Sequence, residues 1–146
     1  MLPQLIERCA ITGLRASAEA LFPTNDYGAP DYRDTDLVAR AVAYWRSLPT
    51  RQRRLIILLF TTIELSAPLL IFGFRRFSRL SLACREQAVR RFRRSRVLPL
   101  RILGDALKAT LTFLYMAHPA ALEYIGATRV GTLALRADGL ATEPSR

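Results

Sequence analysis

The chain has 146 residues, of which 51% are hydrophobic and 23% charged, and it carries a formal net charge of +10. This length is typical of one domain, and the high apolar content excludes an intrinsically disordered basic chain. The two cysteines, Cys9 and Cys84, lie too far apart in sequence to form a local metal or redox motif, which favours free thiols in a reducing compartment.

The first part of the chain predicts two helices that are joined by an acidic loop. Residues 4–21 place apolar side chains three or four positions apart, as one face of a helix does. Residues 23–36 contain two prolines, one glycine, one asparagine and four aspartates, which is typical of a loop with tight turns. We expect Asp34 or Thr35 to cap a second helix over residues 36–48.

A third helix is predicted from Thr50, with Pro68 expected to interrupt or kink it before it continues towards the arginines that follow. Residues 55–74 have the length of a membrane span. Against a span, Glu64 in the middle of this run would cost about 3 kcal/mol, and arginines at both ends set no topology. A buried helix is the alternative for this segment.

The positive charge is concentrated in residues 75–101, which hold ten arginines and one acid, Glu86. Apolar residues interrupt the arginines, and this mixture is typical of a folded helix rather than of a basic tail. We expect Ser81 to cap a helix over residues 82–96. The arginines of such a helix must face water, phosphates, a membrane or another protein.

The remaining sequence predicts a long helix over residues 100–117, separated from the arginine segment by Pro99, and a short segment over residues 120–126. No stretch shows the alternation of a β-strand. The sequence therefore predicts an all-α fold, an irregular bundle of five to six helices in a single domain over residues 1–126. Residues 127–146 are expected to form a loosely structured tail.

The sequence offers few groups for catalysis. Its one histidine, His118, precedes a proline and is expected to terminate a helix rather than to act as a base. The seven glycines form no phosphate-binding motif, and the aspartates of the acidic loop do not have the spacing of a calcium-binding loop. We therefore expect a chain that is not an enzyme and that holds neither a metal nor a cofactor.

Three stretches occur in the order that is found in a known family. ASAEALFPTNDYGAPDYRDTDLV, residues 16–38, resembles the helix, L-F-P and acidic loop that open the gluconate 2-dehydrogenase subunit 3 family. RFSRLSLACREQAVRRFRRSR, residues 76–96, resembles its central F-x-x-L-S segment. Residues 100–126 resemble its closing helix with the H-P segment and the terminal aromatic-x-G. A similar region precedes the flavin domain of long-chain fatty alcohol oxidases.

The resemblance implies a small, non-catalytic helical subunit that binds and stabilises, chaperones or positions a large oxidoreductase. That partner would belong to the glucose–methanol–choline class, would hold FAD and would oxidise an alcohol or sugar hydroxyl. Two departures from the family pattern concern its location and its capping. No export signal precedes Leu14, which implies a cytoplasmic pair, and Cys84 replaces the acidic residue of the capping box.

Aromatic and arginine side chains are the types that carry most of the energy of a protein interface. On this basis we predict that the docking surface includes Phe77, Arg79, Leu80, Phe92, Arg93 and Tyr115. The alternative for the apolar members of this set is a place in the core, and the alternative for the arginines is a solvated face.

Two other functions remain open. The chain is a peripheral or single-pass membrane anchor if residues 55–101 contact anionic headgroups, which would make a cytoplasmic protein membrane-associated. It is a nucleic-acid-binding domain if the arginines line phosphates. Against nucleic acid as a partner, the sequence contains neither a helix-turn-helix with a glycine turn nor an aromatic stacking platform.

Overall fold

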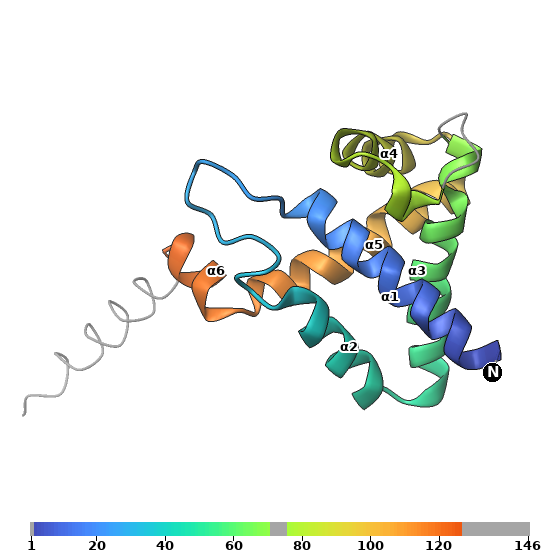
Figure 1. The fold of residues 1–146 in the computed structure, drawn as a ribbon, viewed down its shortest axis with the longest axis horizontal. Coiled ribbons are helices and arrows are strands. Elements are labelled where there is room, and N and C mark those ends of the chain that lie inside the picture. Colours follow the sequence, from blue (N-terminus) through green and yellow to red (C-terminus); the bar gives the residue numbers. More distant parts are fainter. Residues whose placement is uncertain (1, 71–75, 127–146) are drawn as a thin grey trace, which may run out of the picture.

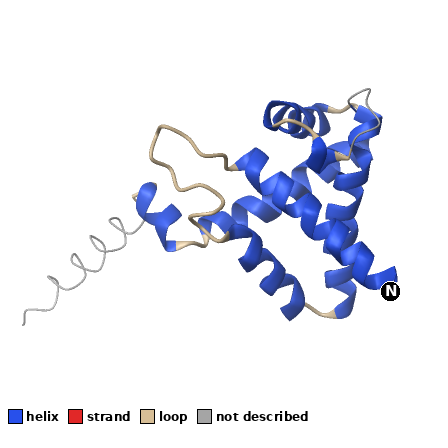
Figure 2. Ribbon diagram, in the orientation of Figure 1, coloured by secondary structure: helices blue, strands red, loops and turns tan. Residues whose placement is uncertain are grey.

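The computed structural model describes residues 2–70 and 76–126, so the predicted tail and the end of the candidate span lie outside the described residues. Within these ranges the chain forms six α-helices and one 3-10 turn and contains no strand, which confirms the all-α prediction (Figures 1 and 2). The elements are α1 (Leu2–Leu21), α2 (Leu37–Ser47), α3 (Thr50–Leu70), η1 (Phe77–Arg79), α4 (Leu82–Arg94), α5 (Leu98–Met116) and α6 (Pro119–Tyr124).

Helix α1 crosses the middle of the molecule and contacts α2, α3, η1, α4 and α5 (Figure 1). Small residues make this possible, because Ala10, Gly13, Ser17 and Ala20 recur every three or four positions on its buried surface. A Cβ atom on Gly13 would lie 2.6 Å from the carbonyl oxygen of Phe60. The backbones of α1 and α3 therefore approach more closely than any larger residue at this position would permit.

One hydrophobic cluster joins buried side chains from all the helices, which agrees with a single domain. Its largest fully buried members are Trp45 of α2, Phe60 of α3 and Phe77 of η1. The rings of Trp45 and Phe60 are tilted against each other, with centroids 5.2 Å apart. Such ring contacts stabilise a core beyond the area that they bury.

The start of α2 differs from the prediction. Asp36 occupies the N-cap position in a left-handed backbone conformation (φ 46°) and makes no capping hydrogen bond with its side chain. Asp34 and Thr35 were wrong as caps because both bond to Asp31. The Asp34 carboxylate accepts from the Asp31 amide at 2.9 Å, and the Thr35 hydroxyl donates to the Asp31 carbonyl at 3.0 Å. The loop thus closes on itself before α2 begins.

The ends of the later helices follow from their prolines and caps. Ser81 caps α4 as predicted, because its Oγ accepts a hydrogen bond from the Cys84 amide at 3.4 Å. Helix α5 begins at Leu98, two residues earlier than predicted, since Pro99 fits the first turn, where no amide hydrogen is needed. Helix α3 is not interrupted at Pro68 and continues to Leu70.

The acidic loop between α1 and α2 is tied to α5. The ring of Tyr115 stacks on Phe22 with centroids 4.0 Å apart, and its hydroxyl donates to the Pro30 carbonyl at 2.6 Å. Within the loop, the Thr24 hydroxyl donates to the Asp31 carboxylate at 2.8 Å. These contacts hold a proline- and glycine-containing segment in one conformation.

Among the described helices, none combines the length and the apolar character that crossing a membrane requires. Helix α3 instead buries one face against α1 and leaves the opposite face exposed.

Candidate functional site

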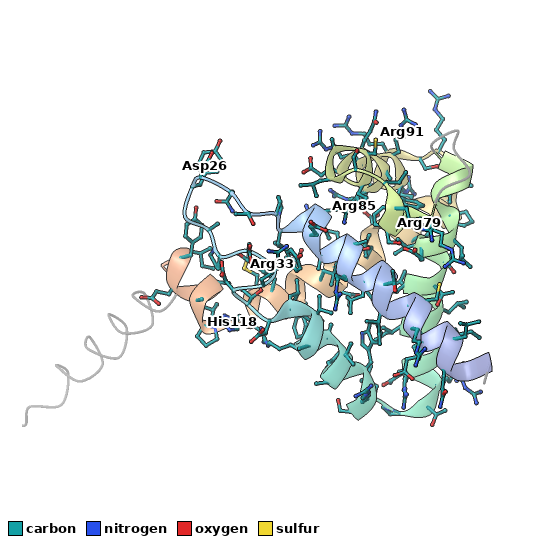
Figure 3. All side chains as sticks on the ribbon, viewed as in Figure 1. Asp26, Arg33, Arg79, Arg85, Arg91 and His118 are labelled. Carbon is teal, nitrogen blue, oxygen red and sulfur yellow. The ribbon has the colours of Figure 1, made fainter. Side chains whose placement is uncertain are left out.

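The arginine segment folds into η1, α4 and the start of α5. Helix α4 is amphipathic, since one stripe consisting of Arg85, Ala88, Val89 and Phe92 is buried. The other arginines of α4 lie on the opposite, exposed side, and Figure 3 shows Arg91 there. We name the exposed arginines of α4, of its link to α5 and of the start of α5 the arginine face: Arg90, Arg91, Arg93, Arg94, Arg96 and Arg101.

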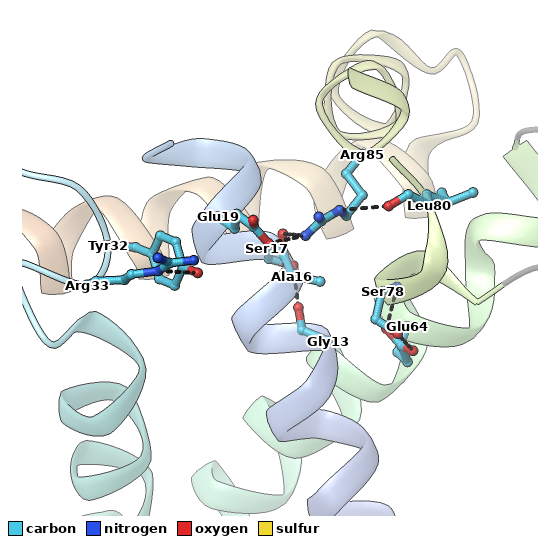
Figure 4. A network of polar contacts seen from close by, with 10 residues as sticks. All are labelled: Gly13, Ala16, Ser17, Glu19, Tyr32, Arg33, Glu64, Ser78, Leu80 and Arg85. Carbon is cyan, nitrogen blue, oxygen red and sulfur yellow. Dashed lines mark hydrogen bonds and ion pairs between the residues drawn. The ribbon is translucent and has the colours of Figure 1, made fainter. Parts of the chain in front are cut away.

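Arg85 is the one buried arginine of α4, and it connects three parts of the chain (Figure 4). Its guanidinium donates to the Glu19 carboxylate at 2.7 Å, to the Ala16 carbonyl at 3.3 Å and to the Leu80 carbonyl at 3.2 Å. A planar guanidinium can make these three bonds at once, whereas a lysine ammonium lacks the forked geometry. Arg85 therefore holds α4 against α1 and is not available to a partner.

Close packing against α5 also fixes the position of α4. A Cβ atom on Gly104 of α5 would lie 2.8 Å from the Cβ of Phe92 and 3.0 Å from the amide nitrogen of Arg93. Because Gly104 has no side chain, the buried Phe92 fits between α4 and α5 without a steric clash. The arginine face is carried on a helix that is fixed on two sides.

Ion pairs occupy part of the arginine face. Arg90 pairs with Glu86 at 3.2 Å, one turn away on α4, and Arg93 pairs with Asp105 of α5 at 3.3 Å. Arg94, Arg96 and Arg101 form no ion pair with any residue that the structure describes. The positive charge that remains uncompensated is therefore concentrated where α4 passes into α5.

Exposed apolar side chains lie beside these three arginines. Val97, Leu98 and Ile102 are 55%, 54% and 56% exposed. Leu98 and Ile102 are one turn apart on α5 and so lie on the same side of that helix. We name this region the α4–α5 corner: Arg94, Arg96, Val97, Leu98, Arg101 and Ile102.

The structure separates the six residues that were predicted to form a docking surface. Phe77 and Phe92 are 0% exposed, and Tyr115 is buried beside the acidic loop, so all three belong to the interior. Leu80 is half-buried against the core. Arg79 and Arg93 are exposed, and Arg93 is already paired with Asp105. The burial of the three aromatic side chains favours the core alternative for them.

A buried carboxylate positions η1, the turn that carries Arg79. Glu64 of α3 is 1% exposed, and it accepts hydrogen bonds from the Ser78 amide at 3.1 Å and from the Ser78 hydroxyl at 2.5 Å (Figure 4). A buried carboxylate needs such donors to offset its loss of hydration. Glu64 therefore attaches η1 to α3 in the interior of the protein.

The groups that were considered for catalysis have structural surroundings. The ring Nδ1 of His118 accepts a hydrogen bond from the Ala120 amide at 3.2 Å, which makes His118 the cap of α6. Burial, and to a smaller extent the nearby Glu64 carboxylate, raise the pKa of the Cys9 thiol. Less of Cys9 is therefore in the nucleophilic thiolate form than for a cysteine in water. Within residues 2–70 and 76–126, no three side chains are grouped as a metal site requires.

Sequence reasoning located the arginine segment but not the α4–α5 corner. The sequence carried a signal for it, because Val97 and Leu98 follow the last arginines of α4 and precede a proline that starts a helix. The structure adds the pairing of Arg90 and Arg93, which shows where the unpaired charge remains.

Comparisons with family models, with curated proteins and with solved structures found no match for the chain.

Proposed function

We propose that the chain is a non-catalytic small subunit that binds and stabilises a large FAD-dependent oxidoreductase of the glucose–methanol–choline class on the cytoplasmic side. The observation that carries this proposal is the α4–α5 corner. It combines three arginines that pair with no described acidic residue and three half-exposed apolar side chains, on a well-anchored pair of helices.

This composition suits a protein partner better than water. Covering an exposed Val, Leu or Ile side chain contributes roughly 1 kcal/mol when about half of its surface becomes buried. Arginine can pair with carboxylates in a planar, two-pronged geometry and is hydrated less strongly than lysine. A partner surface with carboxylates around an apolar centre would complement the corner in both respects.

The family resemblance supplies the class of the partner. The three stretches that carry it, residues 16–38, 76–96 and 100–126, are in contact in the folded chain. Tyr115 of the third stretch donates to Pro30 of the first, and α4 of the second packs against α5 of the third. Three motifs that build one connected unit support the proposal more strongly than three separate short matches would.

Co-expression tests this function. The chain is produced together with a candidate flavoprotein of the glucose–methanol–choline class from the same organism, and the yield of soluble, flavin-containing complex is measured. We expect the yield of the flavoprotein to fall when the small chain is omitted. Equal yields with and without the small chain would contradict the proposal.

Charge reversals then locate the surface. Arg94→Glu with Arg101→Glu should weaken co-purification by at least about tenfold, because each reversal removes an attraction and adds a repulsion. The matched control is Arg51→Glu with Arg54→Glu, two exposed arginines at the start of α3. An equal loss with both pairs would show that net charge, and not the corner, determines binding.

Peripheral membrane binding is a second candidate, and one observation favours it. Three leucines, Leu55, Leu58 and Leu65, are 61%, 61% and 53% exposed on one face of α3, next to Arg51 and Arg54. Such a face could rest on an anionic bilayer with its leucines among the headgroups. Vesicle flotation tests this candidate, because Leu58→Asp should abolish flotation and vesicles without anionic lipid should not bind. A chain that stays unbound with anionic vesicles at low salt excludes it.

A further inference from the structure

A second surface with a pronounced charge lies between α1 and α2, away from the α4–α5 corner. It is a groove of about 810 Å³. Its base contains Val38 and Val42, which are half-buried against the core. Arginines from three separate elements line it: Arg15 of α1, Arg33 of the loop and Arg46 of α2. We name it the α1–α2 groove.

The groove has a net positive charge. Its one acidic lining residue is Asp36, against three arginines. Arg46 has a long contact with Glu7, at 3.7 Å, and is mostly exposed. Arg33 is held by its neighbour Tyr32, since its Nε donates to the Tyr32 hydroxyl at 3.0 Å, as Figure 4 shows. Arg15 is exposed and forms no ion pair with the described residues.

The arginines are spread along the groove and do not converge on one point. Arg46 lies beside Glu7 of α1, whereas Arg33 is near enough to Glu19 for an electrostatic interaction. These two glutamates are twelve positions apart on one helix, which corresponds to roughly 18 Å. A single phosphate or carboxylate cannot contact charges that are so far apart. An extended chain of about five or six residues has the matching length.

The groove lining also distinguishes between kinds of acidic chain. Single-stranded nucleic acid is bound by aromatic rings on which bases stack. The one aromatic ring that lines the groove, Tyr32, has the Arg33 guanidinium over it, 5.4 Å from its centroid. The valine base instead suits aliphatic side chains.

From this arrangement we infer that the α1–α2 groove binds a short acidic segment of a partner protein in extended form. The segment carries carboxylates spaced to meet Arg33, Arg15 and Arg46, with aliphatic side chains between them that cover Val38 and Val42. The inference does not depend on the identity of the partner that binds the α4–α5 corner.

A titration followed by nuclear magnetic resonance tests the inference with the full chain. The probe is a synthetic six-residue peptide that alternates glutamate and leucine, added at up to millimolar concentration to isotope-labelled protein. Amide signals of residues 11–15 and 33–46 should shift together. The same peptide with glutamine in place of glutamate should cause no shifts. Equal shifts with both peptides, or no shifts with the acidic one, would overturn the inference.

Two triple variants with the same loss of charge locate the binding. Arg15→Gln, Arg33→Gln and Arg46→Gln together should weaken the peptide by roughly ten- to fiftyfold, as expected for three exposed ion pairs. Arg94→Gln, Arg96→Gln and Arg101→Gln should leave the affinity within about twofold. Equal weakening in both variants would show attraction to net charge alone and would overturn the inference.

Two further measurements exclude misfolding and nucleic acid. Ala43→Glu places a negative charge on an exposed position of the groove lining and should abolish peptide binding while the circular dichroism spectrum stays unchanged. A single-stranded oligonucleotide serves as the competing probe. If it shifts the groove signals and the peptide does not, the groove binds nucleic acid and the inference is wrong.

Discussion

At the scale of single residues, two of the buried ionisable side chains, Arg85 and Glu64, connect elements of the fold. Arg85 bonds to Glu19, Ala16 and Leu80, and Glu64 accepts two bonds from Ser78. Removing one partner of such a group leaves the other desolvated and unsatisfied, which costs more than the hydrogen bond itself contributed. These two residues therefore govern stability, and we expect binding to depend on arginines of the surface instead.

Ser78→Ala tests the role of the buried carboxylate. The substitution removes one of the two donors to Glu64, and the free energy of unfolding should fall by about 1.5–3 kcal/mol. Urea denaturation measures this change. Ser47→Ala is the matched control, because the Ser47 hydroxyl is exposed and, among the described residues, bonds only to the Tyr44 carbonyl of its own helix. Equal losses in the two variants would contradict a special role for Glu64.

Asp31 gives the acidic loop a dependence on pH. The hydrogen bond from the Asp34 amide, with smaller contributions from Thr24 and Arg33, lowers the pKa of its carboxyl below the usual value of 3.8. A lowered pKa in the folded state means that the stabilisation is present above about pH 4 and disappears as the pH falls through the folded-state pKa. Asp31→Asn should therefore be less stable than the wild type at pH 6, and the difference should shrink below about pH 4. Parallel stability curves in acid denaturation would refute this assignment.

At the scale of elements, hydrophobic spacing predicted the helices well and their ends less well. Leu14, Trp45 and Leu107 are buried where the three- and four-residue spacing placed them. The cap of α2 was missed because Asp34 and Thr35 bond to Asp31, a preference that composition alone does not reveal. Boundaries depend on such local competition, whereas the existence of a helix depends on the whole stripe.

For the candidate site, too, the sequence located the segment but did not reveal which of its side chains are buried. The run of arginines identified the segment, but the spacing of Phe77 and Phe92 fits a core as well as an interface, and the structure places both inside. That Arg85 lies inside follows from its pairing with Glu19, which is distant in sequence. The α1–α2 groove could not be predicted, since its arginines come from three elements whose packing only the folded chain reveals.

Tyr115→Phe tests how the acidic loop is attached to α5. The variant keeps the stack on Phe22 but leaves the Pro30 carbonyl without its donor, so the free energy of unfolding should fall by about 1 kcal/mol. Limited proteolysis should then cut residues 23–36 faster. If Tyr115 contacts a partner instead, this variant would weaken co-purification while stability and proteolysis remain unchanged.

At the scale of the whole molecule, charge is unevenly distributed over the surface. The α4–α5 corner belongs to α4, α5 and their link, whereas the α1–α2 groove is lined by α1, α2 and the loop between them. In the view of Figure 1, α4 lies above α1 and α2 lies below it. Together with the exposed leucines of α3, these regions give the protein three surfaces of different chemistry. A single chain could therefore contact more than one partner surface at a time.

The crowding of like charges predicts that salt stabilises the isolated chain. Raising the ionic strength from about 0.01 to 0.15 M shortens the screening length from about 30 to 8 Å and so weakens the repulsion among the arginines. The midpoint of thermal unfolding should rise over this range. Arg94→Gln with Arg96→Gln should give a smaller rise, because less repulsion remains to be screened. A midpoint that falls with salt would indicate that attractive ion pairs dominate.

The central position of α1 has a consequence for synthesis on the ribosome. Because α1 precedes the elements that cover it, its apolar surface is covered completely only after α5, the last of its neighbours in the chain, has been translated. At about 5–20 residues per second, that wait is roughly 5 to 20 s. During this time part of the α1 surface that later lies in the interior stays exposed. Early engagement by a chaperone, or by the flavoprotein that we propose as its partner, would protect that surface from aggregation.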